Sequence, residues 1–180
     1  MDKTKEGSFM PIFVVLIISF FIAMFWNTFP IIKEAVGFVL NPTAGFLLGW
    51  NITYGFLVLI LIINFVVILA QRYLTDQATM REMKAEQKKL NEEIKEFKHD
   101  PAKMMELQKK QFEFIWPMMK LSMRPMMFTG VPLILFFRWF MDYFVELGNP
   151  KFFGFLNWFW FYLIMSIVIS SVLRKILKVV

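Results

Sequence analysis

The chain has 180 residues, of which 58% are hydrophobic and 18% aromatic, and its formal net charge is +6. Because an ordinary soluble domain is about 45–50% apolar, this composition argues against one and indicates an integral membrane protein. The absence of cysteine excludes disulfide scaffolds, thiolate metal sites and cysteine nucleophiles.

Four apolar stretches occupy residues 9–29, 46–70, 125–147 and 152–173, each near or above the roughly 20 residues that a membrane-spanning helix needs. Helices are expected because they satisfy their own backbone polar groups in lipid. The first stretch follows Lys3 and Lys5, as the apolar part of a signal peptide would. Its length and the lack of a small-residue cleavage site favour an uncleaved span or anchor.

The connection after the first stretch begins at Pro30 and reaches Asn41 and Pro42, a pattern that predicts one short helix. Its apolar residues favour a position along the outer membrane interface. The connection "ELGNPKFFG" before the last stretch predicts a tight outer turn.

Basic residues alternate from one side of the spans to the other. Twelve lie between Arg72 and Arg124, whereas Lys33 and Lys151 stand alone in the other two connections, and Arg174, Lys175 and Lys178 follow the last span. The positive-inside rule therefore predicts a cytoplasmic N-terminus, long loop and C-terminus.

The long loop is predicted to form an antiparallel helical hairpin. In its first arm, 3-4 spacing indicates a coiled-coil seam of Met80, Met83, Gln87, Leu90, Ile94 and Phe97. "HDP" ends that arm, and Asp100 and Pro101 suit the start of the second. The corresponding seam of the second arm is Met105, Gln108, Phe112, Ile115 and Met119.

The first arm, "MREMKAEQKKLNEEIKEFK", the tip "HDP" and the following Pro- and Met-rich span resemble the YidC/Oxa/Alb membrane protein insertase superfamily. The similarity is greatest to its archaeal branch, whose eukaryotic relatives include the third subunit of the endoplasmic reticulum membrane complex. Bacterial members carry an arginine inside the first core helix. Here Asn64 is the only strongly polar residue in the middle of that span, and Arg72 lies at its cytoplasmic end.

The resemblance implies an all-α integral membrane protein with a three-helix transmembrane core and a cytoplasmic antiparallel coiled-coil hairpin after the first core helix. An extra N-terminal hydrophobic helix precedes this core. The expected parts are an N-terminal span or anchor (1–29), an outer interfacial helix (30–45), core helix 1 (46–70), the hairpin (71–124), core helix 2 (125–147), core helix 3 (148–173) and a basic tail (174–180).

Polar residues at helical spacing predict a groove between the core helices. Asn64 is costly in lipid unless it faces protein or water. The expected groove-lining residues are Asn64, Gln71, Arg72, Ser122, Thr129, Ser166 and Ser170. The alternative is ordinary hydrogen bonding between helices.

Half of the 14 methionines lie at 104, 105, 118, 119, 123, 126 and 127. Flexible thioethers suit a surface that accepts varied apolar segments, so Met118, Met119, Met123, Met126 and Met127 are candidates for substrate contact. Packing inside the hairpin and at the start of the span is the alternative.

Basic side chains of the hairpin and tail are candidates for contact with ribosomal RNA or anionic lipid. They are Arg81, Lys84, Lys88, Lys95, Lys98, Lys103, Lys109, Lys110, Arg174, Lys175 and Lys178. Nine acidic residues between Asp76 and Glu113 nearly balance the hairpin charge.

Other polar residues have structural interpretations. Arg138 and Asp142, four residues apart, are predicted to form a structural pair near the outer interface. A single histidine, His99, and no cysteine make a metal site improbable. The sequence contains no grouping typical of catalysis, so neither an enzyme nor a cofactor is expected.

The leading hypothesis is an insertase or intramembrane chaperone of the cell membrane, with nascent membrane proteins and the bilayer as partners, and the ribosome or other membrane subunits as further partners. A structural, membrane-anchored coiled-coil subunit of a larger complex is the second hypothesis. A small ion channel ranks last, since the outer halves of the spans show no continuous polar path.

Overall fold

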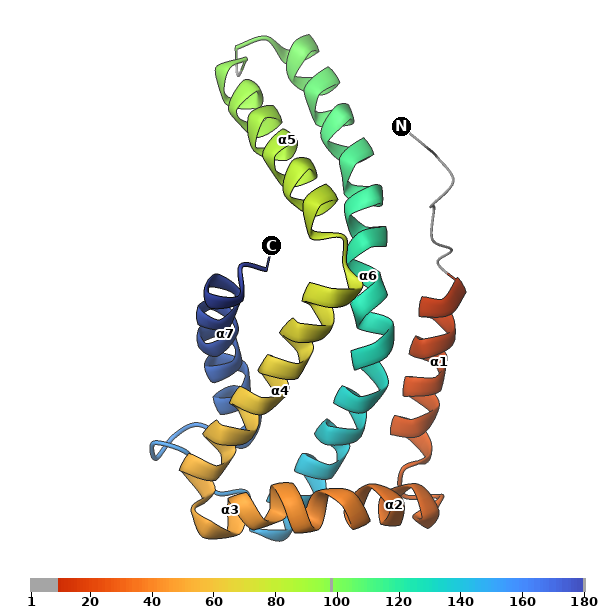
Figure 1. The fold of residues 1–180 in the computed structure, drawn as a ribbon, viewed down its shortest axis with the longest axis vertical. Helices are drawn as coiled ribbons and strands as arrows, with labels where there is room; N and C mark the ends of the chain where they lie inside the picture. Colours follow the sequence, from red (N-terminus) through yellow and green to blue (C-terminus); the bar gives the residue numbers. More distant parts are fainter. Residues whose placement is uncertain (1–9, 98, 180) are drawn as a thin grey trace.

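The computed structural model describes residues 10–97 and 99–179, except for the side chains at positions 11, 12, 124 and 127. The secondary-structure elements of the described residues are helices (Figure 1). They are α1 (Met10–Phe25), α2 (Pro30–Leu40), the π-helical turn η2 (Asn41–Gly45), α3 (Phe46–Trp50), α4 (Ile52–Leu74), α5 (Gln77–Glu96), α6 (Pro101–Glu146) and α7 (Trp158–Leu177).

Four helical segments are long and apolar enough to cross a membrane: Pro30–Trp50, Ile52–Leu74, Phe128–Glu146 and Trp158–Leu177. The stretch 9–29 of the sequence expectation is not among them, and 16 helical residues of α1 are described within it. At 1.5 Å per residue these cover about 24 Å, less than a hydrocarbon core of about 30 Å. Figure 1 shows α1 running alongside α6.

The helix Pro30–Trp50 lies across the ends of α1, α4 and α6 in Figure 1. Pro30 opens it, as expected, and the α-helix α2 ends at Leu40, beside the predicted end at Asn41 and Pro42, but the chain does not leave the helical conformation there. The π-helical turn η2 takes Pro42 into the helix, and the helix continues to Trp50. The expected segment 30–45 corresponds to α2 and η2, and α3 extends the helix beyond it by Phe46–Trp50.

Core helix 1 begins at Ile52, not at residue 46. Asn51 is extended (φ −156°, ψ 119°), and its Oδ1 accepts hydrogen bonds from the N–H groups of Thr53 and Tyr54 at 3.1 and 3.0 Å. This N-cap turns the chain sharply out of α3. Gly55 makes the turn possible, because a Cβ at this position would clash with the carbonyl of Leu47.

The predicted boundary at residue 125 between hairpin and core helix 2 is absent, since α6 is one helix of 46 residues. It contains Pro117, Pro125 and Pro132. Each proline deprives the carbonyl four residues earlier of its partner. For Pro125 that carbonyl belongs to Leu121, and the Thr75 hydroxyl lies 3.5 Å from it as a donor. Thr75, which lies between α4 and α5, thus supplies a hydrogen-bond donor to the α6 carbonyl that Pro125 leaves without one.

The core is an aromatic cluster between α4, α6 and α7 at the end nearest α3. Phe56 of α4 lies at ring-centroid distances of 5.2 Å from Phe140 and 4.9 Å from Phe144, both in α6. Phe152, from the loop before α7, stacks on Phe161 at 4.4 Å. These five rings are essentially buried. The predicted third core helix thus begins late, at Trp158, because Phe152 belongs to a loop that closes this cluster.

Helices α5 and α6 lie side by side beyond the bundle (Figure 1). All six predicted seam residues of the first arm are buried or half-buried, including Met80 and Leu90. The predicted seam of the second arm is wrong at most of its positions, because Met105 and Phe112 are 73% and 67% exposed, whereas Ile115 is half-buried. The less exposed positions there are Met104, Leu107, Gln111, Phe114 and Met118.

Asp100 and Pro101 start α6 as predicted. The Asp100 carboxylate accepts hydrogen bonds from the N–H groups of Ala102 and Lys103 at 3.1 and 3.2 Å, and Pro101 occupies the first turn. The Lys103 ammonium lies 3.9 Å from the ring centroid of Phe97, across the hairpin tip. His99 is exposed at this tip.

Candidate functional site

A polar cavity of about 190 Å³ lies where α4, α5, α6 and α7 meet. Its position is at the ends of the spans remote from α3, because Gln71 and Arg174 belong to the last turns of α4 and α7. The lining residues are Gln71, Thr75, Gln77, Met80, Lys84, Met118, Ser122, Pro125 and Arg174. Three of the predicted groove and tail residues, Gln71, Ser122 and Arg174, thus come together here.

The cavity is lined by two cationic side chains, Lys84 and Arg174, and by no acidic one. Among the residues that the structure describes, neither cation forms an ion pair. The Gln71 side-chain oxygen is buried and has no hydrogen-bond partner within the described chain. The cavity therefore offers two cations and at least one unused polar group to an occupant.

Asn64 lies deeper in the bundle and is only 7% exposed. Its Oδ1 accepts a hydrogen bond of 2.9 Å from Ser166 of α7, and its Nδ2 donates one of 2.8 Å to the Ile60 carbonyl. Hydrogen bonding between helices, the alternative considered for this residue, therefore describes Asn64 and Ser166 in this structure.

The remaining predicted groove residues do not reach the cavity. The Thr129 hydroxyl donates to the Pro125 carbonyl at 3.0 Å and the Ser170 hydroxyl to the Ile167 carbonyl at 3.2 Å, each within its own helix. Arg72 is exposed. Equal spacing along a helix thus placed Gln71 and Ser122 at the cavity but not their neighbours on the same faces.

Of the four candidate methionines whose side chains the structure describes, only Met118 lines the cavity. Met123 is half-buried, whereas Met119 and Met126 are exposed. The side chain of Met127 lies outside the described part. The cavity therefore has a mixed polar and thioether lining, but the methionines do not form one continuous surface around it.

The basic residues of the hairpin that were candidates for contact are exposed wherever the structure describes them, and Lys98 lies outside the described residues. The exposed hairpin residues are Arg81, Lys84, Lys88, Lys95, Lys103, Lys109 and Lys110. In the tail, Lys175 and Lys178 are exposed and Arg174 is half-buried. The hairpin and tail also touch, because the Arg81 guanidinium donates a 2.7 Å hydrogen bond to the Lys178 carbonyl.

One cation of the hairpin is paired on its own helix. The Lys110 ammonium lies 2.8 Å from the Glu106 carboxylate, four residues earlier. This hydrogen bond holds the pKa of the Glu106 carboxyl below its usual value and raises the pKa of Lys110. Lys110 is therefore less available to an external anion than the unpaired Lys84.

The predicted pair of Arg138 and Asp142 is wrong. Asp142 instead binds Lys33 of α2 at 2.8 Å and accepts a 2.9 Å hydrogen bond from the indole N–H of Trp26. The Arg138 guanidinium lies over the Trp26 ring, 5.8 Å from its centroid. The shared partner of both charged groups is Trp26, which links the end of α1 and the start of α2 to α6.

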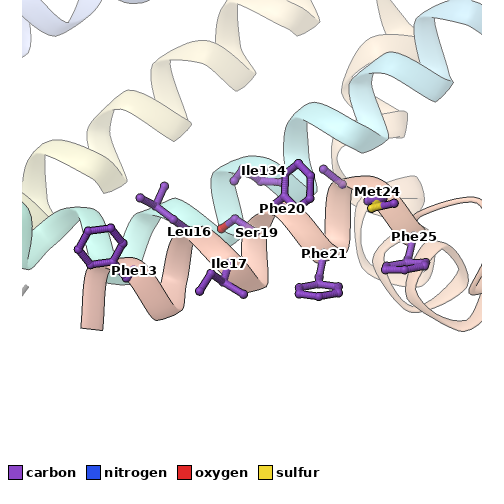
Figure 2. A pocket seen from close by; sticks show the side chains of 10 residues that line it. Phe13, Leu16, Ile17, Ser19, Phe20, Phe21, Met24, Phe25 and Ile134 are labelled. Atoms are coloured by element: carbon purple, nitrogen blue, oxygen red, sulfur yellow. The ribbon is translucent and has the colours of Figure 1, made fainter. Parts of the chain in front are cut away.

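A second, apolar hollow of about 730 Å³ lies along α1. Figure 2 shows Phe13, Ile17 and Phe21 in a row on one face of α1, with Ser19 and Phe20 toward Ile134 of α6. The exposed phenylalanines identify this face as a lipid-facing or partner-facing surface. The hollow has an almost entirely apolar lining, unlike the polar cavity, and the two share no lining residue.

Sequence reasoning missed Thr75, Gln77 and Pro125 as cavity residues. The available signal was local: "LTDQ" breaks the helical pattern between the span and the first arm, and its polar side chains must meet the next helix there. The described residues contain no group of three or more His, Asp or Glu positioned to hold a metal ion.

Comparison with known proteins gives one family match. A family model described as "Integral membrane protein EMC3/TMCO1-like" matches residues 37–153, which include the crosswise helix after residue 37, the hairpin and most of the bundle. No curated protein and no solved structure matches the chain significantly. Because the matched region covers more than half of the sequence, the chain belongs to the EMC3/TMCO1-like family of integral membrane proteins, within the Oxa1/YidC-related insertase superfamily.

Proposed function

We propose that this protein is a membrane protein insertase or intramembrane chaperone of the archaeal YidC-like branch. The observation that carries the proposal is the polar cavity at one end of the spans, opposite the closed aromatic cluster. A membrane segment entering from that end finds polar groups first and tightly packed rings beyond them. The work done is physical, with no catalytic residue and no cofactor.

The mechanism follows from the cost of moving polar groups into hydrocarbon. Water and the side chains of Gln71, Ser122 and Arg174 solvate the polar flank of an incoming segment at the cavity. This shortens the hydrocarbon path that the flank must cross, which lowers the free energy of its transfer. The apolar part of the segment then leaves sideways into lipid. Met118 supplies an adaptable apolar contact beside the polar groups.

The orientation that suits this mechanism places the cavity, the hairpin α5–α6 and the C-terminal tail in the cytoplasm of the cell membrane. The excess of Lys and Arg on that side supports this orientation. The crosswise helix Pro30–Trp50 then lies at the outer interface. The exposed lysines of the hairpin are available to the phosphates of ribosomal RNA, which gives the hairpin a receiving role.

Site-specific photocrosslinking tests the proposal. Crosslinkers placed at Gln71, Ser122 and Met118 should capture short nascent membrane proteins from ribosome–nascent chain complexes. A crosslinker at Val172, exposed on the surface of α7, is the matched control and should capture lipid. Equal capture of the nascent chain at Val172 and at the cavity would remove the main support for the proposal.

A structural subunit of a larger membrane complex is the second candidate. The observations that favour it are the hydrogen bond between Asn64 and Ser166, which joins helices at a position predicted to line the groove, and the exposed apolar face of α1. Depletion of the protein distinguishes the two functions. Loss of a complex with unchanged membrane insertion would favour the structural role.

A further inference from the structure

We propose that the polar cavity is a binding site for a phosphate group, with Lys84 and Arg174 as its two cationic ligands. This site goes beyond the insertase function, because it assigns the cavity a resident ligand even when no client is present. The two cations come from α5 and α7 and line one cavity, and none of its lining residues is acidic. A phosphate would bridge the hairpin to the last core helix.

The chemistry of the lining suits an oxyanion. Arginine offers a planar fork of N–H donors that matches phosphate oxygens, and lysine adds a compact positive charge. Ser122 and Gln71 contribute a hydroxyl and a carboxamide to the same cavity. The oxygen and nitrogen of a Gln side chain are assigned from their surroundings, so a rotated Gln71 carboxamide presents an N–H donor where its buried oxygen now lacks a partner.

The depth of the cavity brings it close to the phosphates of lipid headgroups. The span Ile52–Leu74 is about 34 Å long at 1.5 Å per residue, close to the thickness of a hydrocarbon core. Gln71 and Arg174 in the last turns of their spans therefore lie near the headgroup layer, where lipid phosphates are concentrated. A free phosphate from solution reaches the same position.

The size of the cavity limits the ligand to a headgroup. A volume of about 190 Å³ corresponds to about six water molecules. This accommodates a phosphate and a few waters, but neither a complete lipid nor a helix. The acyl chains of a bound lipid must consequently lie outside the cavity, along the exposed surface of the bundle.

The test uses the purified full-length protein with two probes: inorganic phosphate in detergent solution, and phosphatidylglycerol in phosphatidylcholine vesicles. Bound phosphate is measured by titration calorimetry, and co-purified lipid by native mass spectrometry. Lys84→Gln and Arg174→Gln should each weaken binding about tenfold, because each removes a charge-assisted contact. Lys84→Arg should largely preserve binding, since it retains the charge, and Arg174→Lys should weaken binding less than Arg174→Gln, since it retains the charge but not the planar fork of donors.

Matched controls are Lys88→Gln and Lys175→Gln, which remove the same charge from exposed positions of the same helices. They should change binding less than twofold. Binding of inorganic phosphate identifies a free-ion site, and retention of lipid alone identifies a headgroup site; both support the proposal. Absence of binding with either probe, or equal losses in the controls, would overturn it.

These measurements use no ribosome and no client. A failure of the insertase proposal therefore leaves them unaffected, and a failure of the phosphate site leaves crosslinking of nascent chains to be judged separately.

Discussion

At the scale of single residues, Asn64 is a buried polar side chain with a hydrogen-bond partner for both its oxygen and its nitrogen. Asn64 uses its oxygen for Ser166 and its nitrogen for Ile60, which joins α4 to α7 inside the bundle. Hydrogen bonds between membrane helices contribute about 0.6 kcal/mol on average, because the separated helices also find partners. The contact is therefore one modest stabilising term among many.

A double-mutant cycle of Asn64→Ala and Ser166→Ala should give a coupling free energy of about 0.6 kcal/mol, measured by unfolding in mixed micelles. The control cycle pairs Asn64→Ala with Ser171→Ala, whose hydroxyl bonds to Ile167 of its own helix and should show no coupling. Equal coupling in both cycles would mean that the Asn64–Ser166 bond is not specific.

The contribution of Asp142 to stability depends on its two partners, Trp26 and Lys33. Its carboxylate accepts from the indole of Trp26, a side chain with no exposed surface, and pairs with a half-exposed Lys33. Asp142→Ala should lower the free energy of unfolding by about 1–3 kcal/mol, because it leaves the buried indole N–H unsatisfied. Thermal unfolding in detergent measures this loss.

Two variants serve as controls for Asp142→Ala. Asp142→Asn retains an acceptor for Trp26 and should destabilise less. Lys33→Ala removes only an ion pair that water screens, worth about 0–1 kcal/mol. If Lys33→Ala were as damaging as Asp142→Ala, the ion pair rather than the indole hydrogen bond would hold this junction.

At the scale of elements, the corner between α3 and α4 depends on one glycine. Gly55→Ala places a methyl group against the carbonyl of Leu47 and should destabilise the protein by about 1–3 kcal/mol, since backbone must move. Gly49→Ala, where a Cβ meets nothing within 4 Å, is the matched control and should be tolerated. Thermal unfolding compares the two. Equal behaviour would show that α3 and α4 do not approach so closely.

The hairpin gives a second prediction at this scale. Leu107, 7% exposed, packs in the seam between α5 and α6, so Leu107→Ala should cost about 2 kcal/mol of local stability. Hydrogen exchange of the α5 amides should increase accordingly. Phe112→Ala removes a larger but exposed side chain and should leave exchange unchanged. The reverse result would restore the seam predicted from spacing alone.

These elements show what the sequence could predict. Apolar length indicated membrane helices, and Asp100 with Pro101 correctly marked the start of α6. The second seam was wrong because two candidate stripes, one through Leu107 and one through Phe112, have the same 3-4 spacing. Which of the two stripes is buried is decided by contact with α5, and the sequence of α6 alone does not specify it. Polar spacing predicted Gln71 and Ser122 as site residues, but the cavity also needs Thr75, whose place depends on how the chain turns between helices.

At the scale of the whole molecule, packing is uneven from one end of the spans to the other. Aromatic rings fill the end next to α3, and the polar cavity lies at the opposite end. Polar lining and packed aromatic rings thus lie at opposite ends of the spans. This arrangement gives the two membrane faces different chemical character.

The natural absence of cysteine makes sidedness directly measurable. Single cysteines at Glu92, exposed on α5, and at Asn149, in the loop between α6 and α7, should react with a membrane-impermeant maleimide from opposite sides of sealed vesicles. The proposed orientation expects Glu92→Cys to react in inverted vesicles and Asn149→Cys in right-side-out ones. Labelling of both from one side would contradict the arrangement of spans.

The uninterrupted course of α6 has a mechanical consequence. With 46 residues it extends about 69 Å, from the hairpin tip to the aromatic cluster, and no loop separates its two halves. A force applied at the tip, such as the pull of an attached chain, is transmitted along the helix to Trp139 and Phe140 and is not absorbed by a flexible tether. The helix bends most easily at Pro117, Pro125 and Pro132, because each proline removes one backbone hydrogen bond of the helix.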